Sequence, residues 1–596
     1  MQIHLPLFIN PVQSCTILSN FCLFSTPFFL LSPSRQTARD KQGIRKGYAT
    51  LAQPTNHPFV SRLVIIFKPY AAHRTCTPHL FLPKRHNVQP SVLNEHIYLS
   101  HNGERNKFKH IHSGERNKNQ RYFNEERNKS TQNICIIHLF TVSLQSNQEN
   151  VMTKHVFRRK IYDKMLRWKQ ESQGQSALLI EGARRVGKST IVREFAQNEY
   201  HSYLLIDFNF VSAEVLGYFE HLDNLDILFL RLQNYYDVQL MERQSVIVFD
   251  EVQRCPAARQ AIKYLVQDGR YDYIETGSLI SIRQNTQHIT IPSEEHRIEL
   301  LPLDYEEFLW ATGKAHTMDT LHVFFDKKIA FGQAAHRKNM RDLRIYMLVG
   351  GMPQAVCAYI DTNNMQQVDT VKREILQLYA DDLLKIDPTE RLARLFLAIP
   401  DQLSKNGSRY APTTIVDGIT PTKMSELLQQ LESSKTIYMA YHADDPNVGL
   451  SLNADYKRFK IFLCDTGLFI TLAFWDKDYT ENVLYGKLLG DKLPVNLGYI
   501  FENMVAQMLR ASGNRLFYYT FPKDAKHNYE IDFLLSRGSK LMPIEVKSSD
   551  YKTHPSIDAF AQKFSARLGQ CYLLHTKDVI YDQSLTCLPI YLTPFI

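Results

Sequence analysis

A short loop in the middle of the chain has the residue types needed to bind a phosphate group. The sequence Gly182-Ala183-Arg184-Arg185-Val186-Gly187-Lys188-Ser189-Thr190 follows the pattern G-x-x-x-x-G-K-[ST]. Its two glycines allow the backbone to curl so that successive N–H groups point at a phosphate. We expect Lys188 to reach the β- and γ-phosphates of a nucleotide and Ser189 to ligate Mg²⁺. The motif therefore predicts that these nine residues bind ATP, with Mg²⁺ as the second cofactor.

The segments on either side of the loop are those that such a motif requires. An apolar run, Ala177–Ile180, precedes the loop, and a helix-compatible run, Ile191–Asn198, follows it. A helix in this position directs the positive end of its dipole at the phosphate. The order of strand, loop and helix favours a nucleotide site over the alternative of a glycine loop that binds nothing.

A second apolar run ends in two acidic residues that complete a nucleotide site. Asp250 and Glu251 follow the run Ser245–Phe249 and lie 62 residues after Lys188. A fully buried parallel strand is a continuous apolar run, and its carboxyl end opens into the ligand crevice of the sheet. We expect Asp250 to hold Mg²⁺ through water and Glu251 to polarise the attacking water.

The next predicted strand, Tyr271–Ser278, offers polar side chains where it ends. We expect Thr276 or Ser278 to contact the γ-phosphate or the attacking water. For either residue taken singly, a plain strand-terminating turn is an equally good interpretation. Two further elements are predicted in this region, a strand at Tyr203–Phe208 and a helix at Leu225–Leu240.

These motifs together resemble those of a family of prokaryotic ATPases of the AAA superfamily. The resemblance rests on four segments, Glu181–Ser189, Asp250–Gln253, Thr276–Ser278 and the family signature Leu301–Leu309. It implies a doubly wound parallel sheet and, later in the chain, a C-terminal domain of unknown function. The AAA comparison also implies an arginine finger. No motif places that residue, and Arg283 and Arg297 are the candidates.

The excess of basic over acidic residues is confined to the N-terminal quarter of the chain. The whole chain has a formal net charge of +9, but residues 1–151 alone carry 18 Lys and Arg against 7 Asp and Glu. The remaining residues carry 52 basic and 54 acidic side chains. The net charge therefore gives no reason to expect that these residues bind nucleic acid, although a local basic patch stays open.

Cysteine usage and hydropathy bear on where the protein works. No two of the nine cysteines have C-x-x-C spacing, so there is no zinc or redox signature. Scattered thiols are typical of a reducing compartment, and we expect a cytoplasmic protein. No uninterrupted apolar run reaches about 18 residues, so no membrane-spanning helix is predicted.

Residues 1–151 lack the sustained periodicity of a folded domain. They contain Glu-Arg-Asn-Lys three times at a spacing of eleven residues, at Glu104–Lys107, Glu115–Lys118 and Glu126–Lys129. Met152 follows, and a helical pattern begins after it. We interpret Met152 as the true start and the preceding residues as an artefact of the gene model. The alternative is a disordered basic arm that contacts nucleic acid or a membrane surface.

The region 321–480 connects the nucleotide site to the C-terminal region. Its segment Met347–Pro353 matches another family signature, and its glycines and proline indicate a structural bend. A helix at Met424–Glu432 followed by strands at Thr436–Tyr441 and Phe459–Leu463 resembles a winged helix. The region is not notably basic, so DNA binding by it is disfavoured.

The C-terminal region, residues 481–596, contains a second set of side chains that could do chemistry. Two predicted strands, Tyr529–Leu535 and Pro543–Lys547, form a hairpin that can place Asp532 beside Glu545. Glu545 and Lys547 lie two residues apart and therefore share one face of their strand. A predicted helix, Gly498–Ala506, adds Glu502 from outside the hairpin.

This arrangement resembles the core of PD-(D/E)XK nucleases. The resemblance implies that Glu502, Asp532 and Glu545 hold Mg²⁺ and that Lys547 is catalytic, steadying charge or helping to deprotonate water. The competing interpretation is a surface hairpin with a salt bridge, which is common.

The sequence thus predicts an α/β protein with three folded regions. Residues 152–320 form a P-loop doubly wound parallel sheet, residues 321–480 a helical and winged-helix-like region, and residues 481–596 a small α/β nuclease-like domain. We expect ATP hydrolysis that gates metal-dependent action on DNA or another nucleic acid. Two alternatives stay open: a regulatory ATPase with a non-cleaving interaction module, and a remodeller of protein clients. A homo-oligomer is a further open expectation.

Overall fold

The computed structural model describes residues 155–596 apart from 221, 278–292, 406–408, 477–485, 487–488, 491–497, 549–551 and 582–584. The interpretations of residues 1–151 and of Met152 lie outside the described residues. The chain continues from residue 155 into helix α3 (Ile161–Ser172), which leads directly to the first strand.

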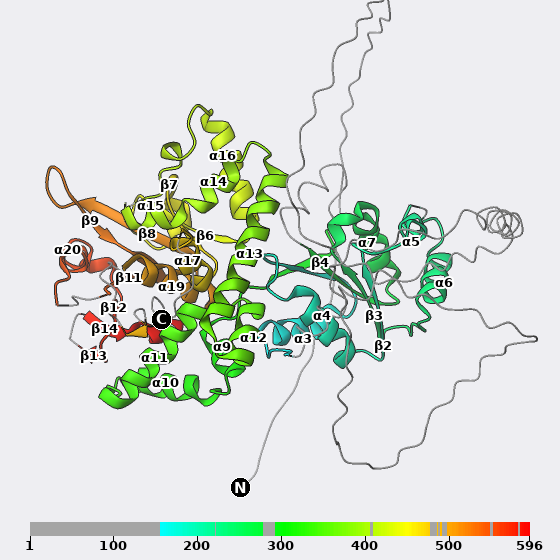
Figure 1. The fold of residues 1–596 in the computed structure, drawn as a ribbon, viewed down its shortest axis with the longest axis horizontal. Helices are drawn as coiled ribbons and strands as arrows, with labels where there is room; N and C mark the ends of the chain where they lie inside the picture. The colour runs from blue at the N-terminus through cyan, green and yellow to red at the C-terminus, as the bar shows by residue number, and fades with distance from the viewer. Residues whose placement is uncertain are drawn as a thin grey trace, which may run out of the picture. The chain divides into compact units, whose positions relative to one another are not determined.

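Five parallel strands form the sheet that follows α3 (Figure 1). Their order across the sheet is β2-β3-β4-β1-β5, and every neighbouring pair is parallel. The strands are β1 (Ala177–Glu181), β2 (Ser202–Asp207), β3 (Ser245–Asp250), β4 (Asp272–Gly277) and β5 (Glu295–Glu299). All residues of β1, β3 and β4 are buried, as expected of strands covered on both faces.

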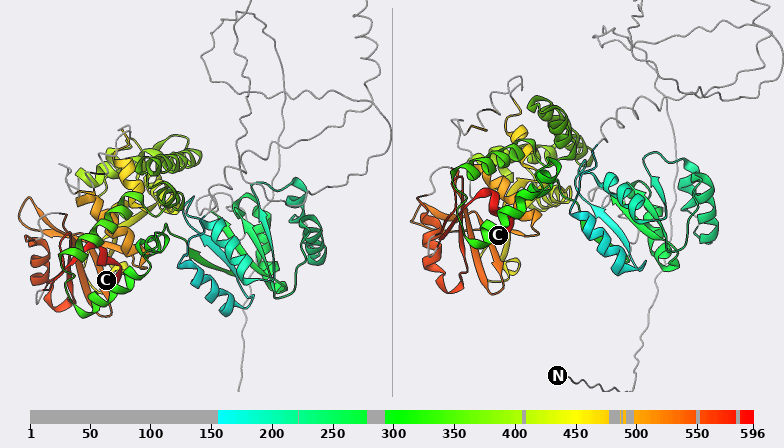
Figure 2. Two further views of the ribbon diagram at one scale, coloured as in Figure 1. Left: turned by 60° about the horizontal axis from the view of Figure 1, so that its bottom comes forward. Right: turned by 90° about the horizontal axis from the view of Figure 1, so that it is seen from below.

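Helices cover both faces of this sheet (Figure 2). Leu178 and Ile180 of β1 join a core with α3 and α4 (Lys188–Glu199). Leu179 points the other way and joins a core with α6 (Leu225–Tyr236) and α7 (Pro256–Asp268). Side chains alternate between the faces of a strand, so these uninterrupted apolar runs supply both cores. The predicted doubly wound parallel sheet is confirmed.

One helix boundary differs from the sequence-based prediction, whereas α4 begins at Lys188, at the end of the loop motif, as expected. Helix α6 ends at Tyr236 instead of Leu240, because Asp237 adopts a left-handed conformation with φ of 51° and its N–H bonds back to Gln233. Such a residue terminates a helix even where the apolar pattern continues.

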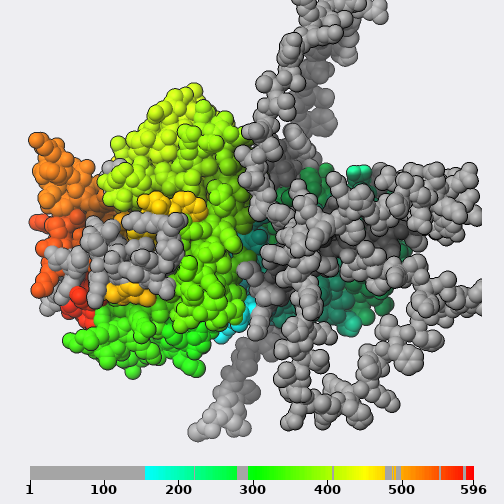
Figure 3. Space-filling view, viewed as in Figure 1, coloured from blue at the N-terminus to red at the C-terminus, as the bar shows by residue number. Residues whose placement is uncertain are grey.

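A run of helices follows the parallel sheet and forms much of the face seen in Figure 3, from green to yellow. Helix α9 begins with a capping box in which Asp304 and Glu307 bond reciprocally to backbone N–H groups. The helices are α9 (Tyr305–Ala311), α10 (His316–Lys327), α11 (Gln333–Val349), α12 (Pro353–Thr362), α13 (Met365–Ile386), α14 (Arg391–Leu397), α15 (Ile399–Lys405) and α16 (Pro421–Ser433).

No single helix of the described residues has both the length and the apolar composition to cross a bilayer. The pair α11 and α12, bent by 120°, meets that test only when both helices are taken together.

A second sheet joins the connecting region to the C-terminal region. Strands β6 (Ile437–Ala443) and β7 (Ala454–Leu463) follow α16 and pair as an antiparallel hairpin. Strand β8 (Leu516–Pro522) pairs with the other edge of β6, and β9 (Asn528–Ile531) pairs with β8. The helix and two strands predicted after residue 421 are therefore present. However, they belong to a sheet that crosses the predicted boundary at residues 480 and 481, and the winged-helix resemblance stays a prediction.

The third sheet is mixed and lies wholly in the C-terminal region, with the order β10-β11-β12-β14-β13. Its strands are β10 (Phe533–Arg537), β11 (Lys540–Val546), β12 (Cys571–His575), β13 (Ile580–Tyr581) and β14 (Leu585–Pro589). Helices α19 (Gly498–Ala511) and α20 (Pro555–Lys563) complete this part of the chain, and α17 (Thr466–Ala473) ends the connecting region. The single strand predicted at Tyr529–Leu535 is two strands, because the chain bends at Asp532 between β9 and β10.

The bend predicted at Met347–Pro353 is a close packing point between α11 and α12. A Cβ atom on Gly351 would lie 2.0 Å from the carbonyl oxygen of Leu303, and one on Gly350 would lie 2.2 Å from a carboxylate oxygen of Asp465. The N–H of Gly351 donates to that same carboxylate at 2.5 Å. No side chain fits between these backbone groups without moving them.

We expect Gly351→Ala to destabilise the protein by about 3 kcal/mol, because the new methyl group must displace a backbone carbonyl. Gly217→Ala in α5 (Ala213–Tyr218) is the matched control, since no atom lies within 4 Å of its would-be Cβ. The urea concentration at the unfolding midpoint should therefore be lower for Gly351→Ala than for Gly217→Ala. Equal midpoints would show that the Leu303 backbone moves aside at little cost.

Candidate nucleotide site and C-terminal carboxylate cluster

The phosphate-binding loop lies between the end of β1 and the start of α4. Its backbone has three residues with positive φ: Gly182 at 158°, Arg185 at 70° and Gly187 at 95°. At Gly182 a Cβ atom would lie 2.4 Å from the carbonyl oxygen of Leu300, so only glycine fits there. Residues with left-handed φ turn successive N–H groups to one side, and this creates a concavity suited to an anion. The predicted strand, loop and helix are all present.

Lys188 is buried and folds back over the loop. Its ammonium donates to the carbonyl oxygens of Gly182 at 3.1 Å and Ala183 at 3.0 Å. Burial lowers the pKa of Lys188, while Glu251 and Asp250 act in the opposite direction. The ammonium is thus a buried cation whose present partners are two neutral carbonyl groups, and a phosphate oxygen would be a stronger acceptor.

The ends of three neighbouring elements meet at Asp250. Ser189 at the start of α4 donates its hydroxyl proton to Asp250 Oδ1 at 2.9 Å. The hydroxyl of Thr276, at the end of β4, donates to the same oxygen. Strand order explains the meeting, since β3 and β4 are adjacent and parallel and their carboxyl ends lie at one edge. A hydroxyl and a carboxylate oxygen are hard donors that fit Mg²⁺.

Glu251 lies one residue beyond β3 in a left-handed conformation with φ of 55°. Its N–H donates to Thr276 Oγ1 at 3.3 Å. The side-chain amide of Gln253 donates to Glu251 Oε2. Gln253 therefore orients the carboxylate predicted to act on water, a role that was not predicted. Its place at the end of the motif Asp250–Gln253, two residues after Glu251, is a signal that could have indicated this role.

Two of the remaining predicted residues, Ser278 and Arg283, lie outside the described residues. Arg297 lies on β5 at the edge of the sheet, where it pairs with Glu295 at 3.1 Å and with Glu181 at 4.0 Å. The identity of an arginine finger stays open.

The predicted hairpin of the C-terminal region is formed by β10 and β11. The pairing of Phe533 with Ile544 continues toward Asp532 and Glu545, and the N–H of Val546 donates to Asp532 Oδ2 at 2.8 Å. Lys547 Nζ lies 2.7 Å from Glu545 Oε1. Burial and the charge of Asp532 raise the pKa of Glu545. The structure thus brings together three of the four predicted residues.

The fourth residue, Glu502 on α19, faces a lysine that the sequence analysis did not single out. Lys460 on β7 is 1% exposed, and its ammonium lies 3.5 Å from Glu502 Oε2. The same ammonium forms an ion pair with Glu530 of β9. Strands β7 and β9 belong to one sheet, and α19 packs against β7, so these side chains come together although they are distant in sequence.

The charges in this cluster depend on one another. Burial opposes the charge of Lys460, but Glu530, Glu502 and Asp532 outweigh it and raise the lysine pKa. Burial raises the pKa of Glu502 to about 7, despite the opposing effect of Lys460. In the part of the chain that the structure describes, no group of three or more His, Cys, Asp and Glu side chains is arranged to hold a metal ion. The metal-binding role of Glu502, Asp532 and Glu545 stays a prediction.

Three family models match successive parts of the chain. Residues 174–309 match the family model of an AAA domain. Residues 340–479 and 497–593 match two models that are each described as a domain of unknown function. No curated protein matches the chain.

Several solved structures match the chain at low similarity. A Walker-type ATPase of Pyrococcus abyssi is 14% identical, with 53% of this chain and 96% of that chain covered and a TM-score of 0.32. A RuvB variant of Thermotoga maritima is 12% identical, with 48% and 90% covered and a TM-score of 0.23. Cdc6p from Pyrobaculum aerophilum is 10% identical, with 58% and 98% covered and a TM-score of 0.20. Likenesses this weak carry no conclusion about activity.

The strand order, the loop between β1 and α4 and the family match define the class of this region. Residues 174–309 form a P-loop domain of the AAA type, and such domains bind nucleotides, typically with Mg²⁺.

Proposed function

We propose that this protein binds and hydrolyses ATP at the site formed by the loop Gly182–Thr190, Asp250, Glu251 and Thr276. The observation that carries the proposal is the meeting of Ser189 and Thr276 at one oxygen of Asp250, directly beside a buried, cationic Lys188. In this arrangement the loop N–H groups and Lys188 bind the β- and γ-phosphates. Ser189 and Asp250 would hold Mg²⁺, which neutralises the charge that develops on the phosphate oxygens.

In this proposal the other side chains prepare the water for attack. Glu251 accepts a hydrogen bond from the water and holds it in line with the γ-phosphate. Gln253 fixes the Glu251 carboxylate. The hydroxyl oxygen of Thr276 accepts a hydrogen bond from the Glu251 N–H and so fixes the backbone of Glu251. The full chain should release phosphate from ATP only when Mg²⁺ is present, and chelation should stop the release. Failure of the full chain to bind ATP would overturn the proposal.

We further propose that the chain is organised as residues 152–320, 321–480 and 481–596. The three family matches support this division, because each falls within one of these ranges. The sheet shared by β6, β7, β8 and β9 indicates that the second and third regions fold together. A homo-oligomer, in which an arginine such as Arg297 reaches a neighbouring site, stays part of the proposal and would be tested by light scattering with ATP.

For the C-terminal region we propose an interaction module that does not cleave nucleic acid and whose state depends on ATP. The observation that favours this role is Lys460, whose ammonium already pairs with the carboxylates of Glu502 and Glu530. The alternative is metal-dependent cleavage of DNA or another nucleic acid, gated by ATP. The placement of Asp532 beside Glu545 and Lys547 favours that alternative, so the two require a direct test.

We expect Lys460→Met to destabilise the protein by about 3–5 kcal/mol, because it leaves buried carboxylates without their counter-ion. Millimolar Mn²⁺, added without nucleotide, should then raise the thermal midpoint of this variant and not that of the wild type. Lys457→Met is the control, since Lys457 is exposed on the same strand. A Mn²⁺-dependent gain in the wild type that Asp532→Asn removes, together with cleavage of nucleic acid, would instead establish the alternative.

A further inference from the structure

Two buried side chains from outside the phosphate-binding loop hold its outer side. The hydroxyl of Tyr379, on α13, donates to the carbonyl oxygen of Arg184 at 2.8 Å. The guanidinium of Arg159, which precedes α3, donates from Nη1 to the carbonyl oxygen of Val186 at 3.0 Å. Arg159 is itself fixed by Glu307 of α9 at 3.2 Å. These bonds leave the inner side of the loop to a ligand.

The planarity of the peptide bond gives these contacts a consequence for phosphate binding. A carbonyl and the next N–H belong to one rigid unit and point in opposite directions. Holding the carbonyl of Arg184 therefore fixes the direction of the Arg185 N–H. In the same way, holding the carbonyl of Val186 fixes the Gly187 N–H. Arg185 has φ of 70°, a conformation that a side chain disfavours and that its surroundings must enforce.

We propose that Tyr379 and Arg159 are positioning residues that fix the N–H groups of the loop toward the phosphates of ATP. The proposal rests on the ATP site described above and adds to it two residues that touch no nucleotide. Without these bonds, the peptide units around Arg185 would rotate more freely, and ATP binding would have to order them again.

Helix α13 connects the loop to α17 of the connecting region. Near its N-terminal end, α13 presents a buried lysine, Lys372, whose ammonium donates to the carbonyl oxygens of Leu348 at 2.7 Å and Gly467 at 3.2 Å. One turn earlier, Asp369 accepts a hydrogen bond from Thr471 of α17 at 2.7 Å. Near its other end, α13 carries Tyr379 and also Asp382, whose carboxylate pairs with the Arg184 side chain at 3.0 Å.

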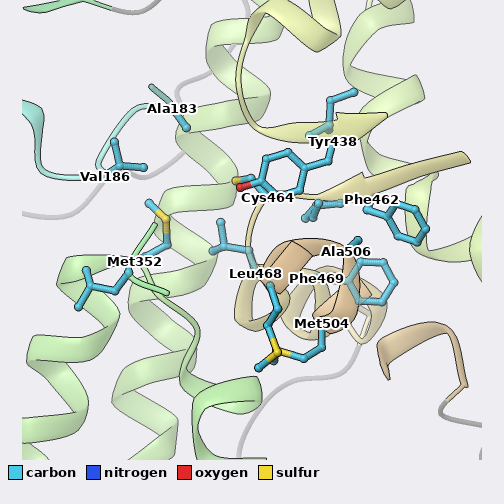
Figure 4. Close-up of a cluster of buried hydrophobic side chains, with 14 of the residues drawn as sticks. Ala183, Val186, Met352, Tyr438, Phe462, Cys464, Leu468, Phe469, Met504 and Ala506 are labelled. Carbon is cyan, nitrogen blue, oxygen red and sulfur yellow. The ribbon is translucent and has the colours of Figure 1, made fainter. Parts of the chain in front are cut away.

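Apolar packing follows the same route. One core contains Ala183 and Val186 of the loop, Met352 at the start of α12, and Leu468 of α17 (Figure 4). A change in the peptide units of the loop would therefore alter the contacts of α13, which is hydrogen-bonded to the loop through Tyr379 and to α17 through Asp369. By thermodynamic linkage, if an ordered α13 raises the affinity for ATP, bound ATP must stabilise the ordered α13 by the same free energy.

Tyr379→Phe tests the proposal because it removes only the hydroxyl group. We expect the dissociation constant for ATP to rise about fivefold, the value of one buried hydrogen bond. Tyr410→Phe is the matched control. Tyr410 is also buried, and its hydroxyl also donates to a backbone carbonyl. The acceptor is the carbonyl of Leu395 in α14, outside the loop. Both variants should lose similar thermal stability, but only Tyr379→Phe should lose ATP affinity. Arg159 is a less direct test because its removal also leaves Glu307 buried and unpaired.

Hydrogen exchange in the full chain gives a second measurement. A non-hydrolysable ATP analogue should slow amide exchange in α13 of the wild type and of Tyr410→Phe, and the slowing should be smaller in Tyr379→Phe. Wild-type ATP affinity in Tyr379→Phe would overturn the proposal and leave the ATP site itself intact. If the wild type bound no ATP, the proposed function would fail first, so the two failures are distinguishable.

Discussion

Lys188→Ala should weaken ATP binding at least a hundredfold and abolish measurable hydrolysis. The ammonium of Lys188 is the buried cation of the loop, and it contributes charge-assisted hydrogen bonds to the phosphates worth about 3 kcal/mol or more in total. It already lies within hydrogen-bond distance of the Gly182 and Ala183 carbonyls. Phosphate oxygens would replace these neutral acceptors, and an alanine side chain has no hydrogen-bond donor or charge to bind them.

Calorimetric titration with ATP and Mg²⁺ measures this loss directly. The control is Lys263→Ala, which removes the same charge from an exposed position on α7 and should leave the affinity unchanged. Loss of the Lys188 ammonium also frees two carbonyl groups, so the thermal midpoint of the variant should be recorded beside its affinity. Undiminished ATP turnover in Lys188→Ala would remove this loop from the active site.

Glu251→Gln should lower the rate of hydrolysis by about a hundredfold to ten-thousandfold, the range typical of a lost general base. The affinity for ATP should change by no more than about twofold, because the amide keeps the shape of the carboxylate and Glu251 does not bind the phosphates in this proposal. The variant should therefore accumulate the ATP-bound state. Phosphate release and equilibrium binding, measured on one preparation, separate the two effects.

The neighbouring contacts sharpen the test of Glu251. Glu242→Gln makes the same chemical change at an exposed position and should leave both quantities unchanged. Gln253→Ala removes the amide that holds Glu251 and should lower the rate less than Glu251→Gln does. If ATP affinity falls as far as the rate in Glu251→Gln, the residue is structural and another group activates the water.

The sequence by itself determined the elements of the nucleotide-binding region of this protein. The loop motif, the apolar run before Asp250 and the position of Thr276 predicted elements that the structure contains. Local rules are sufficient there, because each strand, turn and helix is encoded by consecutive residues. In addition, parallel strands place their carboxyl ends at one edge whatever the details of packing. The same rules predicted the β10–β11 hairpin, which joins neighbouring segments.

Only the tertiary structure decided which distant residues complete these sites. Lys460 meets Glu502 because α19, which lies beyond the predicted boundary, packs against β7, and no local pattern encodes packing between elements so far apart. Tyr379 likewise reaches the loop through long-range packing. It lies about 195 residues from Arg184 in the sequence, and tertiary packing decides which face of α13 contacts the loop. A buried lysine and a buried tyrosine look like ordinary helix and strand residues in the sequence. Their roles follow from long-range contacts, which the periodicity of a single chain does not contain.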